Sequence, residues 1–177
     1  MATPGAAGYT GAWRGRLVQP APPTTGGSMQ LVHEFTFTAT LAPPLPIGAG
    51  PIGTRVYYDV TGGEISGDRV RGNVLGGGEW ALIGPDGFLR VDVRLQAETH
   101  DGAHLYIQYV GLLGLNEAVQ SALASGAGTN FGDQYFFTNP RIETGDERYS
   151  WLNTTFFVGE GHLLPNSAVE YRVSRPA

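Results

Sequence analysis

Hydrophobic and polar residues alternate along most of the chain with the period of two that is typical of β-strands. In residues 88–99, Leu, Val, Val, Leu and Ala occupy every second position from 89 to 97, while Arg, Asp, Arg, Gln and Glu fill positions 90 to 98 between them. Similar runs, rich in Val, Ile, Thr, Tyr and Phe and bounded by Gly, Pro, Asn and Asp, predict further strands. The expected strands are 31–41, 54–60, 69–75, 79–83, 88–99, 103–111, 134–143, 149–158 and 168–174.

The segments between the expected strands carry residues that suit tight turns. Glycine, asparagine and aspartate tolerate the backbone angles that hairpin turns require. The glycine run 76–78 lacks the lysine and the following helix of a phosphate-binding loop, so we expect a β-bulge there, next to a ligand pocket. The turn candidates are residues 61–63 (TGG), 66–68 (SGD), 85–87 (PDG) and 101–102 (DG).

Residues 116–125 have the spacing of a helix. Leu115, Val119 and Leu123 recur every four residues. Asn116 is a good N-terminal cap, and Gly126 follows the last helical position. One helix cannot cover both faces of a large sheet, so the pattern favours a closed barrel, with a two-sheet sandwich as the alternative.

We therefore expect an all-β protein, a small antiparallel β-barrel of about nine or ten strands with one short helix. The 177 residues fit one domain, which we place at 29–177. Residues 1–28 are rich in Ala, Gly, Pro and Thr and cannot bury enough apolar surface to offset the entropy of ordering them. The sequence predicts a flexible N-terminal arm there.

Charge and composition exclude two classes of partner. The net charge is -5 and no run of basic residues occurs, which argues against nucleic acid. No window approaches the roughly 18 consecutive apolar residues of a membrane span. The chain has no cysteine and no export signal, so we expect a cytoplasmic protein. With nucleic acid and membrane set aside, we expect the partner to be a small-molecule ligand. A homodimer is one assembly that the sequence leaves open.

Polar and aromatic side chains share a face on several expected strands, as in a ligand pocket with apolar walls and a few oriented polar groups. A two-residue turn at 101–102 would place Arg94 opposite Tyr109, with Asp92 two residues away on the same face. A carboxylate, a guanidinium and a phenol in contact could polarise a carbonyl or move a proton. We predict Asp92, Arg94 and Tyr109 as catalytic residues; the alternative is a structural ion pair between Asp92 and Arg94.

The same reasoning predicts substrate-binding residues on other strands. They are Arg55 and Tyr57 on one strand face, Tyr149, Trp151 and Asn153 on another, and Trp80. The tryptophans could stack on a flat ligand, or they could belong to the ordinary core. The histidines show no metal-ligand spacing on any one element, so we expect no metal and no other cofactor.

An ordered series of motifs carries a family resemblance. The motifs are residues 53–55 (GTR), 61–67 (TGGEISG), 71–80 (RGNVLGGGEW), 91–94 (VDVR), 99–103 (THDGA), 140–145 (PRIETG) and 149–153 (YSWLN). Together they resemble the domain-of-unknown-function 3237 family over roughly 31–173. The resemblance implies a small barrel akin to lipocalins, dirigent proteins and allene oxide cyclases. The family usually has Asp before the tryptophan of its glycine-rich motif, where this chain has Glu79.

The resemblance also implies relatives that act on natural-product intermediates as cyclases or pericyclic catalysts. Our first hypothesis is therefore a cofactor-independent isomerase or cyclase that acts on an apolar, partly aromatic, natural-product-like molecule. The barrel would hold the reactive conformer. The alternatives are a non-catalytic carrier of the lipocalin type and a structural protein whose barrel interior is filled.

Overall fold

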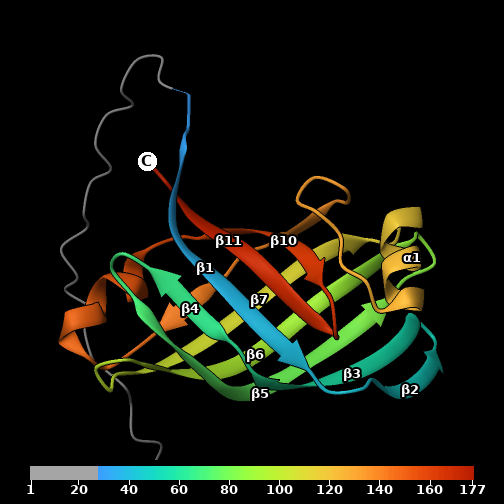
Figure 1. The fold of residues 1–177 in the computed structure, drawn as a ribbon, viewed down its shortest axis with the longest axis horizontal. Coiled ribbons are helices and arrows are strands. Elements are labelled where there is room, and N and C mark those ends of the chain that lie inside the picture. Colours follow the sequence, from blue (N-terminus) through green and yellow to red (C-terminus); the bar gives the residue numbers. More distant parts are fainter. Residues whose placement is uncertain (1–27) are drawn as a thin grey trace, which may run out of the picture.

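Antiparallel pairing closes one sheet into a barrel. The computed structural model describes residues 28–177, which contain eleven strands in this one sheet. β1 pairs with β11 along most of its length, and Figure 1 shows the two strands side by side. The all-β fold is as predicted; the arm expected at 1–28 lies, except for Ser28, outside the described residues. The strands are β1 (Leu31–Leu41), β2 (Leu45–Gly50), β3 (Gly53–Gly62), β4 (Glu64–Gly67), β5 (Arg71–Ile83), β6 (Phe88–Thr99), β7 (His104–Gly114), β8 (Phe136–Thr138), β9 (Arg141–Glu143), β10 (Val158–Leu164) and β11 (Ala168–Pro176).

Side-chain alternation separates the inside of the barrel from the outside. On β6 the even-numbered polar residues face out, and the odd-numbered Leu, Val and Ala residues are buried. Phe35 and Phe37 of β1 contribute the largest rings from the closing strand, and both are buried. The apolar faces of all these strands are buried together inside the barrel. Their removal from water favours closure of the sheet between β1 and β11.

A bulge in β5 reverses which residues face inward. The register with β6 shifts between Val74 and Gly76, so two residues oppose one at this point. Before the bulge, Gly72 and Val74 face the core; after it, Glu79 and Ala81 do. The bulge expected at the glycine run is confirmed, and it joins two predicted strands, 69–75 and 79–83, into one.

The helix is confirmed in position and in both caps. α1 spans Glu117–Ser125, and the Asn116 side chain accepts a hydrogen bond from the amide of Val119. Gly126 ends the helix in the left-handed region at φ 70°, which glycine adopts without strain. Val119 and Ala122 are buried, so α1 packs against one end of the barrel (Figure 1).

Two strand predictions are wrong in the C-terminal half. The strand expected at 149–158 is instead a 3-10 helix, η1 (Glu147–Thr154), capped by the Asp146 side chain, and β10 follows it. The strand expected at 134–143 is divided into β8 and β9, because Pro140 has no amide hydrogen for the ladder. In residues 28–177, no helix has the length and apolar character needed to cross a bilayer.

Candidate functional site

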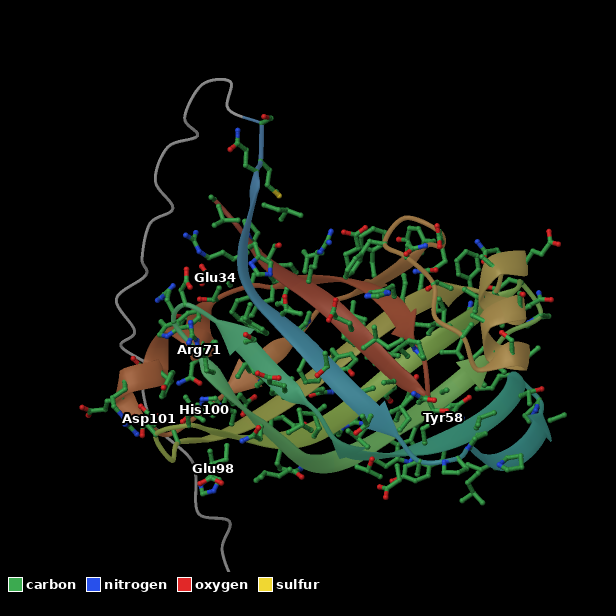
Figure 2. The ribbon with its side chains drawn as sticks, viewed as in Figure 1. Glu34, Tyr58, Arg71, Glu98, His100 and Asp101 are labelled. Atoms are coloured by element: carbon green, nitrogen blue, oxygen red, sulfur yellow. The ribbon has the colours of Figure 1, made fainter. Side chains whose placement is uncertain are left out.

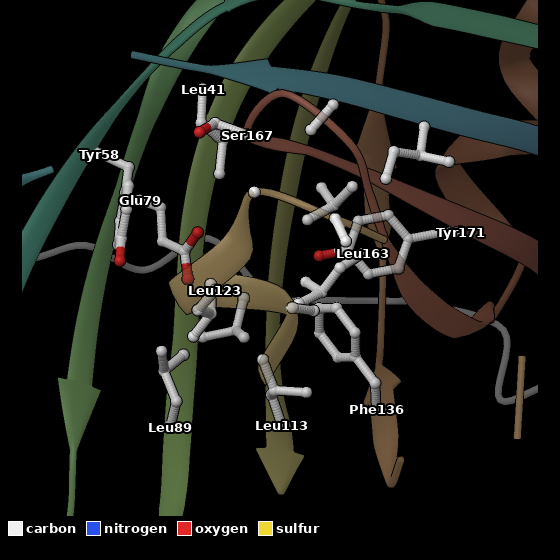
Figure 3. A pocket seen from close by; sticks show the side chains of 17 residues that line it. Leu41, Tyr58, Glu79, Leu89, Leu113, Leu123, Phe136, Leu163, Ser167 and Tyr171 are labelled. Carbon is white, nitrogen blue, oxygen red and sulfur yellow. The ribbon is translucent and has the colours of Figure 1, made fainter. Parts of the chain in front are cut away.

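A cavity of about 120 Å³ opens at the end of the barrel that carries α1 (Figure 3). An apolar cavity of about 150 Å³ binds benzene, so this slightly smaller cavity, which is open at its mouth, is close to the size of one small ring. Its walls come from β3, β5, β6 and β7 on one side and from β8, β10 and β11 on the other. Most of the lining is apolar, including Leu41, Leu89, Val91, Leu113, Phe136 and Leu163.

Packed aromatic rings in the middle of the barrel form the floor of the cavity. Tyr171 stacks on Phe37 with ring centroids 5.8 Å apart, and its edge meets Tyr109 at 5.5 Å. Phe136 packs against the same ring at 5.2 Å. These contacts fill the middle of the barrel, so they separate the cavity from the η1 end.

Four polar side chains line the cavity: those of Tyr58, Glu79, Ser167 and Tyr171. Glu79 and Tyr58 are cross-strand partners on β5 and β3. Figure 3 shows the Glu79 carboxyl and the Tyr58 hydroxyl extending into the cavity from one wall, with the Tyr171 hydroxyl directed into it from the opposite side. A carboxyl and two phenols thus face the same small space.

The Glu79 carboxyl lacks a partner in residues 28–177: it forms no ion pair and accepts no side-chain hydrogen bond there. The Glu79 side chain is half-buried, and it lines the cavity. Burial raises the pKa of Glu79 to about 7, and the negative charge of Asp92 adds to the rise. This carboxyl therefore exchanges a proton near neutral pH.

The phenols around Glu79 keep their protons. Burial raises the pKa of Tyr58, and the negative charge of Glu79 raises it further. Tyr109 and Tyr171 are fully buried, and burial is again the largest cause of their raised pKa values. The hydroxyl of Tyr58 is therefore available as a neutral hydrogen-bond donor at the cavity, whereas that of Tyr171 is engaged with the Tyr109 hydroxyl.

The mouth of the cavity lies between α1 and the turn that joins β10 to β11. Leu123 of α1 lines the cavity and is 60% exposed. Asn166 and Ser167 in the turn both have positive φ, at 62° and 57°, which is uncommon outside glycine. The turn is held to its surroundings, since the Ser167 carbonyl accepts a hydrogen bond of 2.8 Å from the amide of Leu41.

Five predicted site residues lie together on the outer face of the barrel, away from the cavity. Asp92 and Arg94 form an ion pair of 3.0 Å, and each is more than a third exposed. Tyr57 packs against Trp80 with centroids 5.3 Å apart, and the Arg55 guanidinium donates to the Trp80 carbonyl at 2.7 Å. The structure brings these residues together, but their polar groups are paired with one another or, for Tyr57, with a neighbouring carboxylate.

The predicted pairing of Arg94 with Tyr109 is wrong by one residue. Arg94 is opposite Gln108, and Tyr109 is opposite Val93 and points inward. The cause is the turn between β6 and β7, in which Gly102 has φ 87° and three residues, not two, separate Thr99 from Ala103. A shift of one residue exchanges the two faces of a strand.

The remaining predicted residues belong to η1, at the other end of the barrel. Tyr149 donates a hydrogen bond of 2.9 Å to Asp101, and Figure 2 shows Asp101 at the end opposite Tyr58. Trp151 packs on the core, with Arg69 over its ring at 3.7 Å. The Asn153 side-chain amide accepts a hydrogen bond of 2.8 Å from the Thr144 amide and donates one of 3.0 Å to the Thr144 carbonyl. These contacts hold a loop in place and leave the cavity untouched.

Sequence reasoning missed Tyr58, Ser167 and Tyr171 and gave no role to Glu79. The available signal was the departure from the family at Glu79, together with the bulge that turns this residue inward. No three His, Cys, Asp or Glu side chains come together as a metal site in the part of the chain described, 28–177.

Comparisons with known proteins agree with this fold. A UPF0311 protein of Rhodopseudomonas palustris is 31% identical over 133 residues, covering 75% of this chain and 87% of that protein. The crystal structure of a conserved protein of unknown function from the same organism is similar with a TM-score of 0.76 and 29% identity, covering 86% of this chain and 100% of that one.

A more distant relative has a named activity. The hydroalkoxylation enzyme phnH of Penicillium herquei is 27% identical over 122 residues, covering 68% of this chain and 67% of that enzyme. The likeness to lipocalins and dirigent proteins stays a prediction. The family described as Protein of unknown function (DUF3237) matches residues 29–175. Because this match covers nearly all of the described residues, the chain belongs to the DUF3237 family.

Proposed function

We propose that this protein is an acid–base isomerase or cyclase that rearranges a small, largely apolar molecule by proton transfer at Glu79. The observation that carries the proposal is an unpartnered carboxyl in an apolar cavity, with a pKa of about 7. At neutral pH such a group is present in both its acid and its base form. General acid–base catalysis is most efficient when the pKa of the catalytic group lies near the working pH.

The two phenols support the same chemistry. Tyr58 is the cross-strand partner of Glu79, and its hydroxyl enters the cavity beside the carboxyl. A neutral phenol can donate a hydrogen bond to an oxygen on which negative charge develops. Tyr171 faces the pair from the opposite wall and could hold the other end of the molecule. The tight aliphatic lining would hold a folded, reactive conformer and exclude water.

The activity named for the Penicillium relative fits this set of groups. Hydroalkoxylation adds the O–H of an alcohol across a carbon–carbon double bond. When both groups are in one molecule, the π bond breaks, one C–H and one C–O bond form, and the product is an isomer of the substrate. In this chain, Glu79 would give its proton to the alkene carbon and recover one from the hydroxyl. The reaction then balances, and the carboxyl is regenerated.

A panel of neutral alkenols with one ring, such as 2-allylphenol, tests the proposal. Incubated with the protein in D2O, a turned-over substrate gains one deuterium at carbon in a cyclic ether product. We expect Glu79→Gln to reduce the rate by roughly 10²- to 10⁴-fold, the usual contribution of a positioned acid–base group. Glu64→Gln, an exposed carboxyl on β4, is the control and should keep the rate.

Two outcomes would contradict the proposal. A rate that survives in Glu79→Gln would place the proton transfer elsewhere. Binding of the alkenols without any conversion would favour the carrier alternative over the enzyme.

A further inference from the structure

The charge of the cavity lining limits what the site can hold. We infer that the cavity takes an uncharged molecule with an acceptor oxygen and rejects carboxylates and phosphates. This inference rests on the proposed function, because it specifies the substrate class of the same site.

The lining has a negative group and no positive one. Glu79 is the one residue with an acidic or basic charge among the 17 that line the cavity. The chain has no lysine, and the arginines within 28–177 lie elsewhere. Arg90 and Arg94 are paired with acids on the outer face, at 2.6 and 3.0 Å, and Arg148 is paired at the η1 end.

An anionic ligand would therefore be buried without a counter-ion. Transfer of an ionised carboxylate or phosphate into apolar surroundings is strongly unfavourable unless a cation or several donors meet it. Here it would also approach Glu79, whose ionised form repels it. Carboxylate and phosphate substrates, including nucleotide-linked ones, have no cationic partner in this cavity.

The hydrogen-bonding groups match a neutral oxygen. The Tyr58 hydroxyl and the protonated form of Glu79 are donors that enter the cavity from one wall (Figure 3). An ammonium group must replace all of its water, and in this largely aliphatic cavity it would find one carboxylate and a few hydroxyl oxygens. A carbonyl, ether or hydroxyl oxygen on a hydrocarbon ring uses the available donors without burying a new charge.

Three one-ring probes of similar size separate these classes: acetophenone, benzoate and benzylamine. Acetophenone and benzoate are both planar and differ mainly by a methyl group in place of a charged oxygen. Two-dimensional NMR titrations of the full chain, followed at the methyl groups of Leu123 and Leu163, give each dissociation constant. We expect acetophenone to bind at least tenfold more tightly than benzoate and more tightly than benzylamine.

The Glu79→Gln variant and the pH add independent readouts. The Glu79 carboxyl can donate to a carbonyl only in its protonated form, so acetophenone affinity should fall as the pH rises through about 7 in the wild type. In Glu79→Gln this dependence should disappear, and the gap between acetophenone and benzoate should narrow as the like-charge repulsion is removed.

Benzoate that binds as tightly as acetophenone, or benzylamine that binds more tightly, would overturn the inference, as would the absence of binding by all three probes. The outcome is distinguishable from that of the proposed function. Selective binding of acetophenone with no conversion of any alkenol would keep this inference and remove the catalysis. Conversion of an alkenol together with tight benzoate binding would keep the proposed catalysis and overturn the inferred preference for uncharged molecules.

Discussion

Tyr58 and Glu79 occupy directly opposed positions on β3 and β5, and both side chains enter the cavity (Figure 3). Opposed residues in an antiparallel pair have Cβ atoms about 4.5–5.5 Å apart, so a phenol and a carboxyl are held as neighbours by the sheet itself. The charge of Glu79 helps to raise the pKa of Tyr58, which keeps this phenol a donor. The sheet thus positions the acid and the donor without help from a loop.

Glu79 should make the protein less stable as the pH rises. Its pKa is raised from 4.5 in an ordinary setting to about 7 in the folded protein, so the folded state holds its proton more tightly than the unfolded state does. The stabilisation is complete below about pH 4.5 and is lost as the pH rises through about 7, by an amount on the order of 3 kcal/mol. Urea unfolding at a series of pH values measures it.

Glu79→Gln should remove this part of the pH dependence, whereas Glu64→Gln should retain it. A Glu79→Gln protein whose stability still falls by the same amount between these pH values would show that another group is responsible.

Tyr58→Phe should weaken acetophenone binding by about twofold to tenfold, because a lost hydrogen bond is worth about 0.5–1.5 kcal/mol. The preceding residue is the matched control. Tyr57 bonds Asp59 on the outer face, so Tyr57→Phe should leave the affinity unchanged. NMR titration of both variants compares the two faces of one strand; equal effects would mean that the hydroxyl of Tyr58 makes no contact with the ligand.

Asp92→Asn should lower the pKa of Glu79. Asp92 is outside the cavity, but its negative charge disfavours ionisation of Glu79 through the sheet. The midpoint of the pH-dependent acetophenone binding should therefore move to lower pH, while stability changes by about 0–1 kcal/mol, as for exposed ion pairs. Glu98→Gln, on the same outer face of β6, serves as the control. Complete loss of binding in Asp92→Asn would instead point to a direct role for Asp92.

Leu123→Trp should obstruct the mouth of the cavity. Leu123 is 60% exposed, so the larger ring can be accommodated with a stability change within about 0.5 kcal/mol. We expect acetophenone affinity to fall at least tenfold. Leu45→Trp is the control, since Leu45 is 61% exposed but lies on β2, away from the cavity. An unchanged affinity in Leu123→Trp would mean that ligands enter by another route.

Gly77→Ala should destabilise the barrel at the β5 bulge. A Cβ at Gly77 would lie 2.3 Å from the Arg94 carbonyl oxygen, whereas one at Gly76 would have its nearest neighbour at 3.4 Å. The two glycines have similar φ angles, 159° and 152°, so their difference isolates the contact with β6. Urea unfolding should show Gly77→Ala to be less stable than Gly76→Ala by roughly 1–3 kcal/mol. Equal stabilities would mean that the strands separate there without cost.

Local features of the sequence were sufficient for the elements that depend on near neighbours. The bounds of β6 follow from alternation within the strand, and α1 follows from its own spacing and from the caps at Asn116 and Gly126. These signals depend on a few adjacent residues, so distant parts of the chain do not change them. The barrel could be inferred as well, since many strands and a single predicted helix leave few other ways to cover the sheet edges.

The candidate site depended on pairing between strands, which alternation within one strand does not determine. One extra residue at the bulge between Val74 and Gly76 turns Glu79 inward and Trp80 outward. One extra residue in the turn that contains Gly102 places Gln108 opposite Arg94 and leaves Tyr109 in the core. The sequence by itself determined the extent of strands such as β1 and β6, the position of α1, and which residues share a face within a regular strand. Only the tertiary structure decided which face meets the cavity, because a strand's register is set by its hydrogen-bonded neighbours.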